Sequence, residues 1–507
     1  MGNMRFRIET VLFILFLFCN ISIIMPSVPL SNAAENDTTA VETHYYMEDS
    51  SVIDNLDKES DTAKISKKNF FRNLFFSGFD HPQMPGWPKL IGVDGWSPNG
   101  VTFADVNGDG FLEILVGSTD GSFHVWDYHG NELPGWPKLG LQSIACKPAV
   151  GDVDPCFPGL EIIVASEANT VYAWHNDGTD VLGWPRHTDR SIGVVRSPVL
   201  FDIDNDGYLE IILGQEHFPM GSVVIYRRDG TIYPGWPQTL DYACIATPSV
   251  ADIDNDGIVE ICAVSCRSIY LWDKDGNIEP GWPILNNHHG SDGTAFSQQV
   301  LADLDNDGDL EILVAYSKPS NGFLQNYVGV FYHDGRSFVG WPQKYPGPET
   351  RMCPVAGDVD EDGDLEIFNG GSLINIPDFT GRHHTGEQLE GLWPVIVGFV
   401  DCSPIITDID NDRRQEIITG DQHIPDGNLF AFNSDGTIVE GWPITMDGPA
   451  NTNSPTVGDV DGDGDTELGL ITCYSPSGYA TVNLWTFENT TYNISWISYR
   501  MENLFSR

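Results

Sequence analysis

One nine-residue pattern recurs along this chain and limits its possible folds more than any other feature. It has acidic or amide side chains at positions 1, 3 and 5, usually a glycine at position 6, and a glutamate at position 9, as in Asp202–Glu210. Eight copies occur, one of them degenerate, and their first residues lie 47 to 55 residues apart. A period of this length predicts a repeat protein in which each unit is one supersecondary element. The first residues are Asp105, Asp152, Asp202, Asp252, Asp303, Asp358, Asp408 and Asp459.

Each repeat also contains four short segments with the composition and spacing of β-strands. An apolar segment precedes the acidic pattern, a second follows it, as at 112–116, and a third alternates apolar and polar residues, as at 123–127. A glycine-containing turn leads into the fourth segment, and no stretch has helical periodicity. Four short antiparallel strands in about 50 residues are typical of a propeller blade. We therefore predict an all-β fold, an eight-bladed β-propeller of four-stranded antiparallel blades, with a seven-bladed ring as the alternative.

The fourth segment of most repeats ends in Pro-Gly-Trp-Pro or a variant of it. We predict that these tryptophans pack between blades, with a ring of sugar-binding aromatic side chains as the alternative. An additional copy at 85–88 precedes the first acidic pattern. This copy is predicted to be an outer strand that pairs with the last blade, which would close the ring and leave no exposed edge. The tryptophans of the repeats are Trp136, Trp184, Trp236, Trp282, Trp341, Trp393 and Trp442.

The acidic pattern has the chemistry of a calcium loop. Calcium binds roughly six to eight oxygen ligands at about 2.3–2.6 Å, and a short loop can wrap its own carboxylates around the ion. Side chains two residues apart converge if the loop curls, and the glycine permits the turn. The backbone carbonyl at position 7 and both oxygens of the glutamate would complete the shell. A helix–loop–helix calcium hand is excluded because its glutamate comes at position 12 between helices, and magnesium fits less well because it retains waters.

Seven of the eight patterns are predicted to hold calcium, about seven ions in all, with a structural role; a solvated acidic turn is the alternative. We expect the seventh loop to bind less tightly because Arg413 replaces the turn glycine. The second, Asp152–Glu161, is expected to bind poorly or not at all, because it lacks a third acid and carries an insertion. The predicted ligands, loop by loop, are Asp105, Asn107, Asp109, Phe111 and Glu113; Asp202, Asp204, Asp206, Tyr208 and Glu210; Asp252, Asp254, Asp256, Ile258 and Glu260; Asp303, Asp305, Asp307, Asp309 and Glu311; Asp358, Asp360, Asp362, Asp364 and Glu366; Asp408, Asp410, Asp412, Arg414 and Glu416; and Asp459, Asp461, Asp463, Asp465 and Glu467.

These repeats resemble the FG-GAP/VCBS repeats of integrin-alpha type, including their secreted bacterial and archaeal relatives. The resemblance covers about residues 79–490 and rests on the Asp-x-Asp-x-Asp-Gly-x-x-Glu loop inside a four-strand unit. The Phe-Gly and Gly-Ala-Pro signatures of the integrin repeats are missing, and integrins have seven blades. The resemblance therefore implies a calcium-binding β-propeller, and it does not by itself imply cell adhesion.

Charge and the N-terminal segment bear on where the protein works. The formal net charge of −47 argues against nucleic acid, which needs clustered Lys and Arg, and against an anionic membrane surface. Residues 1–34 have the pattern of a signal peptide, with an uncleaved anchor as the alternative. A flexible acidic and polar spacer follows at 35–78, and the propeller occupies 79–507. We expect a secreted or cell-surface monomer whose mature chain does not insert into a membrane.

Cysteines in an exported chain can form disulfides. Cys244 and Cys266 fall on strands of one repeat, and Cys353 and Cys402 occupy similar positions in neighbouring repeats. Disulfides and buried thiols both remain open.

Repetition itself bears on function, because a ring rarely needs eight near-identical active sites. The acidic loops are therefore predicted to be structural, and function is expected at the opposite end of the blades. Longer polar segments are predicted to gather there, at 215–217, 288–292, 383–384 and 421–423. No catalytic residue is assigned. We expect a recognition or adhesion module that binds a surface protein or a glycan.

A calcium-dependent polysaccharide lyase or hydrolase is the alternative function. A loop histidine would act as the base beside an arginine that binds an acidic sugar. No nucleophile motif, zinc signature or fixed histidine spacing accompanies these residues. The residues considered for this role are His217, His288, His289, His383, His384, His423, Arg190, Arg267 and Arg382.

Overall fold

Short apolar runs separated by tight turns form 30 β-strands in the part of the chain that the structure describes. The signal peptide and spacer predicted at 1–34 and 35–78 lie outside the described residues, which belong to the unit Ser60–Arg507. No helix among the described residues has the length and apolarity needed to cross a membrane. The computed structural model describes residues 81–487 except 93–99, 168, 189–195, 218–219, 245, 286–296, 321–322, 347–351, 372–377, 399, 401, 411, 423–426, 451–452 and 474–478.

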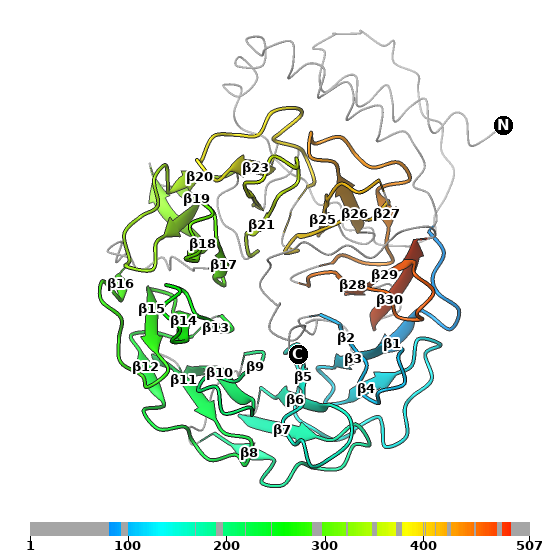
Figure 1. Cartoon of the computed structure of the whole chain (residues 1–507). Coiled ribbons are helices and arrows are strands. Elements are labelled where there is room, and N and C mark those ends of the chain that lie inside the picture. The colour runs from blue at the N-terminus through cyan, green and yellow to red at the C-terminus, as the bar shows by residue number, and fades with distance from the viewer. Residues whose placement is uncertain are drawn as a thin grey trace, which may run out of the picture. The chain divides into compact units, whose positions relative to one another are not determined.

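The strands form eight antiparallel sheets, arranged as the blades of a ring (Figure 1). Each blade corresponds to one sequence repeat, and consecutive strands pair in order. The first four blades contain β2 (Thr102–Ala104), β3 (Glu113–Gly117) and β4 (Phe123–Trp126); β5 (Ala149–Gly151), β6 (Glu161–Ala165), β7 (Thr170–Trp174) and β8 (Arg186–His187); β9 (Val199–Phe201), β10 (Glu210–His217), β11 (Met220–Tyr226) and β12 (Gln238–Leu240); and β13 (Ser249–Ala251), β14 (Glu260–Val264), β15 (Ser268–Asp273) and β16 (Ile284–Leu285).

The remaining blades follow the same order around the ring. They contain β17 (Val300–Ala302), β18 (Glu311–Ser320), β19 (Phe323–Phe331) and β20 (Gln343–Lys344); β21 (Val355–Gly357), β22 (Glu366–Gly370) and β23 (Phe379–His383); β24 (Ile405–Thr407), β25 (Glu416–Gly420), β26 (Asn428–Phe432) and β27 (Ile444–Thr445); and β28 (Thr456–Gly458), β29 (Thr466–Thr472), β30 (Ala480–Phe487) and β1 (Lys89–Ile91). In blades 1 and 6 single bridges, Phe123 to Lys138 and Phe379 to Val395, mark the fourth-strand position. The eight-bladed prediction is confirmed, and the seven-bladed alternative is wrong.

The ring is closed by the N-terminal end of the described chain. Strand β1 pairs antiparallel with β30, with Leu90 opposite Thr481. The backbone N–H of Met84 also donates to the carbonyl of Leu484 at 2.8 Å. The outer strand predicted around 85–88 therefore completes blade 8, as expected.

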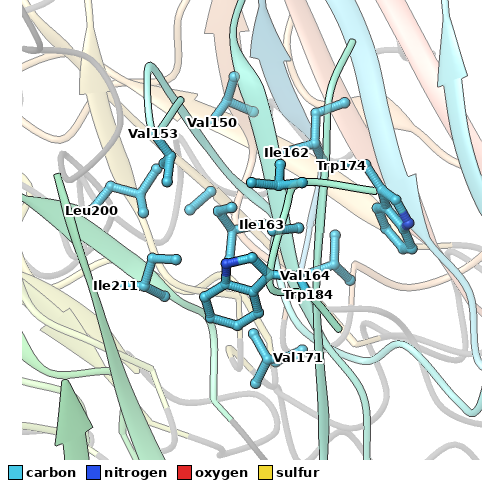
Figure 2. Packing of buried hydrophobic residues seen from close by; sticks show 14 of the residues in the cluster. Val150, Val153, Ile162, Ile163, Val164, Val171, Trp174, Trp184, Leu200 and Ile211 are labelled. Atoms are coloured by element: carbon cyan, nitrogen blue, oxygen red, sulfur yellow. The ribbon is translucent and has the colours of Figure 1, made fainter. Parts of the chain in front are cut away.

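The core lies between the blades. Strands β3, β6, β14, β22 and β25 are buried at every residue, because the second strand of a blade packs against neighbouring blades on both of its faces. One apolar cluster extends over blades 1 to 3 and includes Leu115, Ile163 and Leu200. Figure 2 shows Ile163 and Val164 of β6 packed beside Trp184. Burial on both faces explains why these strands are continuous apolar runs.

The repeated tryptophans connect each blade to the next. In seven successive blade pairs, the indole Nε1 donates to a backbone carbonyl in the turn between the third and fourth strands of the following blade. The preceding glycine makes this approach possible, because a Cβ at Gly135 would collide with the carbonyl oxygen of Asp177. The packing interpretation is confirmed. The bonds run from Trp87 to Tyr128 (2.8 Å), Trp136 to Asn176 (2.9 Å), Trp184 to Arg228 (2.9 Å), Trp236 to Lys274 (2.9 Å), Trp282 to His333 (2.7 Å), Trp341 to His384 (2.6 Å) and Trp393 to Ser434 (2.7 Å).

Candidate metal centres

The acidic loops all lie at the same end of their blades. Each loop connects the first and second strands of a blade, as 105–112 connects β2 to β3. Because the strands alternate in direction, the turn between the third and fourth strands lies at this end too. The turn between the second and third strands lies at the other end. We call the end that carries the acidic loops the acidic face and the other end the opposite face.

The glutamate at position 9 is held by its own loop. It stands at or next to the start of the second strand, and its side chain is 0–3% exposed in all eight blades. One carboxylate oxygen, Oε2, accepts a hydrogen bond from the backbone N–H of position 2. This contact orients the second oxygen of the carboxylate toward the aspartates. The donor–acceptor pairs are Val106 and Glu113 (2.9 Å), Val153 and Glu161 (2.8 Å), Ile203 and Glu210 (3.2 Å), Ile253 and Glu260 (2.7 Å), Leu304 and Glu311 (2.8 Å), Val359 and Glu366 (3.1 Å), Ile409 and Glu416 (2.8 Å), and Val460 and Glu467 (2.9 Å).

The aspartates curl the loop around a common centre. In blade 3, Asp202 accepts the backbone N–H groups of Asp206 at 3.0 Å and Gly207 at 2.8 Å, and Asp206 accepts that of Tyr208 at 2.9 Å. Blade 4 repeats these contacts with its own residues. The acids at positions 1 and 3 and the glutamate at position 9 thereby bring their oxygens within 4.8 Å of one another. This convergence is shown for Asp202, Asp204 and Glu210; Asp252, Asp254 and Glu260; and Asp303, Asp305 and Glu311.

Positions 4 and 6 adopt left-handed backbone conformations in the intact loops wherever the structure describes them. Position 4 is Asn205 in blade 3, with φ +63°, and position 6 is Gly207, with φ +88°. Asparagine and glycine tolerate this region best. In blade 7 Arg413 takes the place of the glycine at φ +75° and still donates its N–H to Asp408 at 3.1 Å. The seventh loop therefore keeps the shape at the expense of backbone strain.

Several carboxylate oxygens in these loops are buried and accept no hydrogen bond from the protein. A buried polar atom without a partner is costly, and a cation would satisfy it. The donor set is all oxygen in most loops, which is the chemistry that calcium prefers. The residues present therefore fit a bound divalent cation. These atoms are Oδ1 of Asp204, Asp254, Asp303, Asp358 and Asp459, and Oε1 of Glu311, Glu416 and Glu467.

The glutamates are difficult to ionise without such a cation. Burial, with a further contribution from the neighbouring aspartate charges, raises the pKa of Glu260 and Glu416 to about 8. The same causes raise the pKa of Glu210 and Glu311 to about 7. Near neutral pH the loops therefore need positive charge to keep these carboxylates ionised.

Blades 5 to 8, with their four acidic loops, match a known family of repeats. The FG-GAP-like repeat family matches residues 303–368 and 408–470, which span these loops and the strands that flank them. The match agrees with the eight-bladed ring and with the loop geometry. The chain is an FG-GAP repeat β-propeller.

Solved structures share the fold of this FG-GAP propeller at low sequence identity. The biofilm matrix protein Bap1 of V. cholerae is similar with a TM-score of 0.56 and 13% identity, over 81% of this chain and 91% of that one. Sqt1 of Saccharomyces cerevisiae is similar with a TM-score of 0.52 and 11% identity, over 79% of this chain and 99% of that one. Comparison with curated protein sequences finds no match. These similarities show the fold alone.

The first loop of the FG-GAP propeller departs from the others at position 3. The side-chain amide of Asn107 donates to Oε1 of Glu113 at 2.9 Å and to Asp109 at 3.1 Å. In this loop the amide nitrogen of Asn107 therefore points toward the carboxylates, where the other loops have an aspartate oxygen at position 3. For Asn107 to act as the predicted ligand, the amide has to turn its oxygen toward the ion.

The degenerate second loop is closed by a histidine. Nδ1 of His175 lies 3.0 Å from Oε1 of Glu161, and the two side chains are 8% and 0% exposed. Phe157, from the insertion, stacks on the imidazole at 3.8 Å between ring centroids. Oε2 of Glu161 accepts the N–H groups of both Val153 and Asp154 at 2.8 Å. Every oxygen of this glutamate is therefore satisfied by protein groups.

His175 was not identified from the sequence, although a signal was present. It lies directly across from Glu161 in the sheet, because Ile162 pairs with Trp174. Counting outward from the turn between the second and third strands would have placed it there. The same position in blade 6 is His383, opposite Glu366.

The residue at position 7, whose backbone carbonyl is a predicted ligand, also makes contacts through its side chain. The side chain contacts the turn between the third and fourth strands of its own blade. Phe111 packs on Tyr128 at 5.2 Å, and the guanidinium of Arg228 lies 3.9 Å from the ring centre of Tyr208. Oδ2 of Asp309 lies 3.0 Å from Nδ1 of His333. These contacts tie the loop to the outer half of the blade.

The structure corrects part of the predicted opposite face. His383 ends β23 and touches Glu366, so His383 and His384 lie at the acidic face. Arg382 also lies near that end, where it donates to the carbonyl of Gly386 at 2.9 Å. The error arose because the segment was counted as a turn between the second and third strands, whereas it follows the third. Of the other lyase candidates, Arg190, His288, His289 and His423 lie outside the described residues.

The four cysteines considered for disulfides, Cys244, Cys266, Cys353 and Cys402, are all thiols. Cys244 is buried and Cys266 is half-buried, and neither forms a disulfide. Burial raises the pKa of the Cys244 thiol to about 11, so this sulfur is protonated at neutral pH.

Proposed function

We propose that this protein is a calcium-stabilised recognition module of the cell exterior, which binds a surface protein or a glycan through the opposite face of the ring. Calcium is assigned a structural role in the acidic loops, about seven ions in all. The first support is the repetition of one loop geometry around the ring, which suits a structural element better than a single binding site.

The observation that carries the proposal is the difference between the two ends of the blades. At the acidic face the repeats agree closely. At the opposite face the second and third strands differ in length, from five residues each in β22 and β23 to ten and nine in β18 and β19. Blades 3 and 8 carry long hairpins of β10 with β11 and β29 with β30. At about 3.3 Å per residue, β18 is roughly 15 Å longer than β22.

Long hairpins on a rigid ring present backbone and side chains at fixed positions, which suits recognition of a large partner. The fold of Bap1, a biofilm matrix protein, makes extracellular polysaccharides reasonable first test ligands. The proposal makes no use of a catalytic group.

Binding is tested with the hairpin of blade 5. Purified protein is assayed against a panel of acidic and neutral extracellular polysaccharides and against whole cells, in calcium. A variant in which residues 318–325 are replaced by Asn-Gly keeps the pairing of Ser317 with Asn326 and shortens only the projecting part. We expect this variant to lose binding while its melting temperature in calcium is unchanged. Release of unsaturated sugar ends from any polysaccharide would instead indicate a lyase.

The structural role of calcium is tested by chelation. Each site adds about 2.7 kcal/mol of stability when free calcium is 100 times its dissociation constant. Several sites together predict a large rise in melting temperature on adding calcium to EDTA-treated protein. An unchanged melting temperature would contradict the structural role.

A further inference from the structure

Blade 6 differs from the other intact blades in having an imidazole directly opposite the position 9 glutamate of its acidic loop. Nδ1 of His383 lies 3.2 Å from Oε1 of Glu366, and the two side chains are 20% and 0% exposed. His383 is brought there by strand register, because it is the residue directly opposite Glu366 in the antiparallel pair of β22 and β23. The position is therefore set by the sheet.

Four further carboxylates of the loop surround this histidine or lie beside it. The ligand atoms of Asp360, Asp362 and His383 lie within 4.8 Å of one another, and so do those of Asp364, Glu366 and His383. Oδ1 of Asp364 is buried and accepts no hydrogen bond, and Oδ1 of Asp358 is in the same state. The histidine thus stands between two pairs of acids whose hydrogen-bonding capacity is incompletely used.

An ion pair between His383 and Glu366 does not account for this arrangement. In blade 2 the equivalent His175 is covered by Phe157, and only Asp152 and Asp154 accompany Glu161 in the loop. In blade 6 the loop carries five carboxylates at positions 1, 3, 5, 7 and 9. Two imidazoles lie beside them, His383 and His384, whose Nδ1 is 2.9 Å from Oδ2 of Asp364, and together they can offset at most two of the five charges. Blade 2 is satisfied without an ion, whereas blade 6 retains an excess of negative ligands.

The mixture of donors indicates which cation would be preferred. Calcium and magnesium bind oxygen ligands, whereas imidazole nitrogen is a preferred ligand of zinc and neighbouring transition metals. Histidine together with aspartate or glutamate is a common zinc donor set. A nitrogen donor therefore shifts selectivity away from calcium at this one position in the ring.

We propose that the acidic loop of blade 6 is a site for a divalent transition-metal ion, bound by Nδ1 or Nε2 of His383 with at least two of the neighbouring carboxylates. This inference rests on the proposed function only in that the acidic loops hold cations. It makes blade 6 chemically distinct from the loops of blades 3 and 8, whose predicted ligands are all oxygen atoms.

The test is zinc retention in competition with calcium. Untagged protein is stripped with a chelator, dialysed against millimolar calcium with a few equivalents of Zn²⁺, and analysed for both metals. We expect about one zinc per chain. His383→Asn, which introduces the residue found at the equivalent position in blade 7 (Asn433), should weaken zinc binding by at least about 100-fold and leave the calcium-loaded melting temperature unchanged.

Two further variants make the result specific. Asn433→His places an imidazole opposite Glu416 and should add a second retained zinc. His124→Asn alters a histidine–glutamate pair (2.6 Å to Glu132) outside the acidic loops and should change nothing. Substituting Co²⁺ for zinc should give visible absorption bands that His383→Asn shifts or removes.

The outcomes separate this inference from the calcium proposal. If the other loops bind calcium but no zinc is retained, or if zinc is retained equally by His383→Asn, the inference is wrong and the structural role of calcium stands. If calcium does not bind but zinc is retained in a way that depends on His383, the calcium proposal is wrong and the inference stands.

Discussion

At the residue scale, the glutamate at position 9 connects the sheet to the loop. One of its oxygens accepts a backbone hydrogen bond from position 2, and the other faces the aspartates. The side chain is fully buried in several blades. A single residue therefore fixes the start of the second strand and supplies negative charge to the candidate metal centre, and these two roles can be separated by mutation.

We expect Glu416→Gln to separate them. In the wild-type protein the N–H of Ile409 donates to Oε2 of Glu416 at 2.8 Å, and the glutamine oxygen can still accept this bond. The amide group of the glutamine can donate to the aspartates, whereas the carboxylate of Glu416 repels them. The EDTA-treated variant should be more stable than wild type by about 1–3 kcal/mol. The same variant should gain less stability from calcium, because it has lost an ionised ligand. Chemical denaturation with and without calcium measures both effects; lower stability in EDTA would contradict this account.

The raised pKa values predict an unusual pH dependence for the metal-free protein. The folded pKa values of the glutamates, about 7 to 8, lie above their ordinary value of 4.5, so the folded state holds these protons more tightly than the unfolded state. This contribution to stability is full below about pH 4.5 and is lost as the pH rises through about 8. In EDTA the melting temperature should fall between pH 5 and pH 8. A rise over this range would contradict the assignment.

The ligand residues could be predicted from the sequence because they follow one another in a loop whose period repeats. The requirement for left-handed backbone at position 4 was missed, although asparagine or glycine stands there in most loops, as in Asn205 and Gly462; Glu361 is the exception. His175 and His383 were missed as partners of the loop glutamates for a different reason. Their contacts depend on strand register, which a local pattern does not specify.

At the element scale, a blade can be stabilised in two ways. In most blades the loop brings several carboxylates close together, and a bound cation would offset their repulsion. In blade 2 the pair of His175 and Glu161 makes the same connection between the second and third strands without one. Blade order, strand number and the closing strand were all predictable, because apolar runs and turns mark them. The length of the hairpin of β18 and β19 was not, since the pattern shows where a strand starts at the acidic loop and says little about where it ends.

We expect His175→Ala to destabilise the protein independently of calcium. Removing the imidazole leaves Oε1 of Glu161 buried without a partner, at a cost of about 3 kcal/mol, typical of breaking a buried charged pair. The loss should be the same in EDTA and in calcium. His124→Ala is the matched control, because its pair with Glu132 is partly exposed and should cost less than about 1 kcal/mol. A loss seen only in calcium would mean that blade 2 also holds an ion.

At the scale of the whole ring, the tryptophan contacts and the closing strand make each blade depend on its neighbours. Seven of the indoles donate to the next blade, and β1 pairs with the outer edge of β30. Closure rests on a three-residue strand and the contacts of Gln83 and Met84 with the last blade. The last blade is therefore completed by a strand from the start of the propeller.

We expect Ile91→Asp to open the ring at this junction. Ile91 is 3% exposed in the apolar cluster beside Val482, so a buried carboxylate would release β1 and leave the edge of β30 unpaired. An unpaired edge promotes association between chains. Light scattering should show higher oligomers, and limited proteolysis should cut near the start of the propeller. Leu90→Asp, at a side chain 58% exposed on the same strand, should behave like wild type.

The pairing of β1 with β30 also sets an order of events during synthesis. The strand that completes blade 8 is made before any complete blade, and its partner follows about 390 residues later. At about 5–20 residues per second, β1 waits roughly 20–80 seconds for its partner to be translated. Any message truncated before β30 therefore yields a chain with two unpaired sheet edges. Only a chain translated through β30 can therefore complete blade 8 and close the ring.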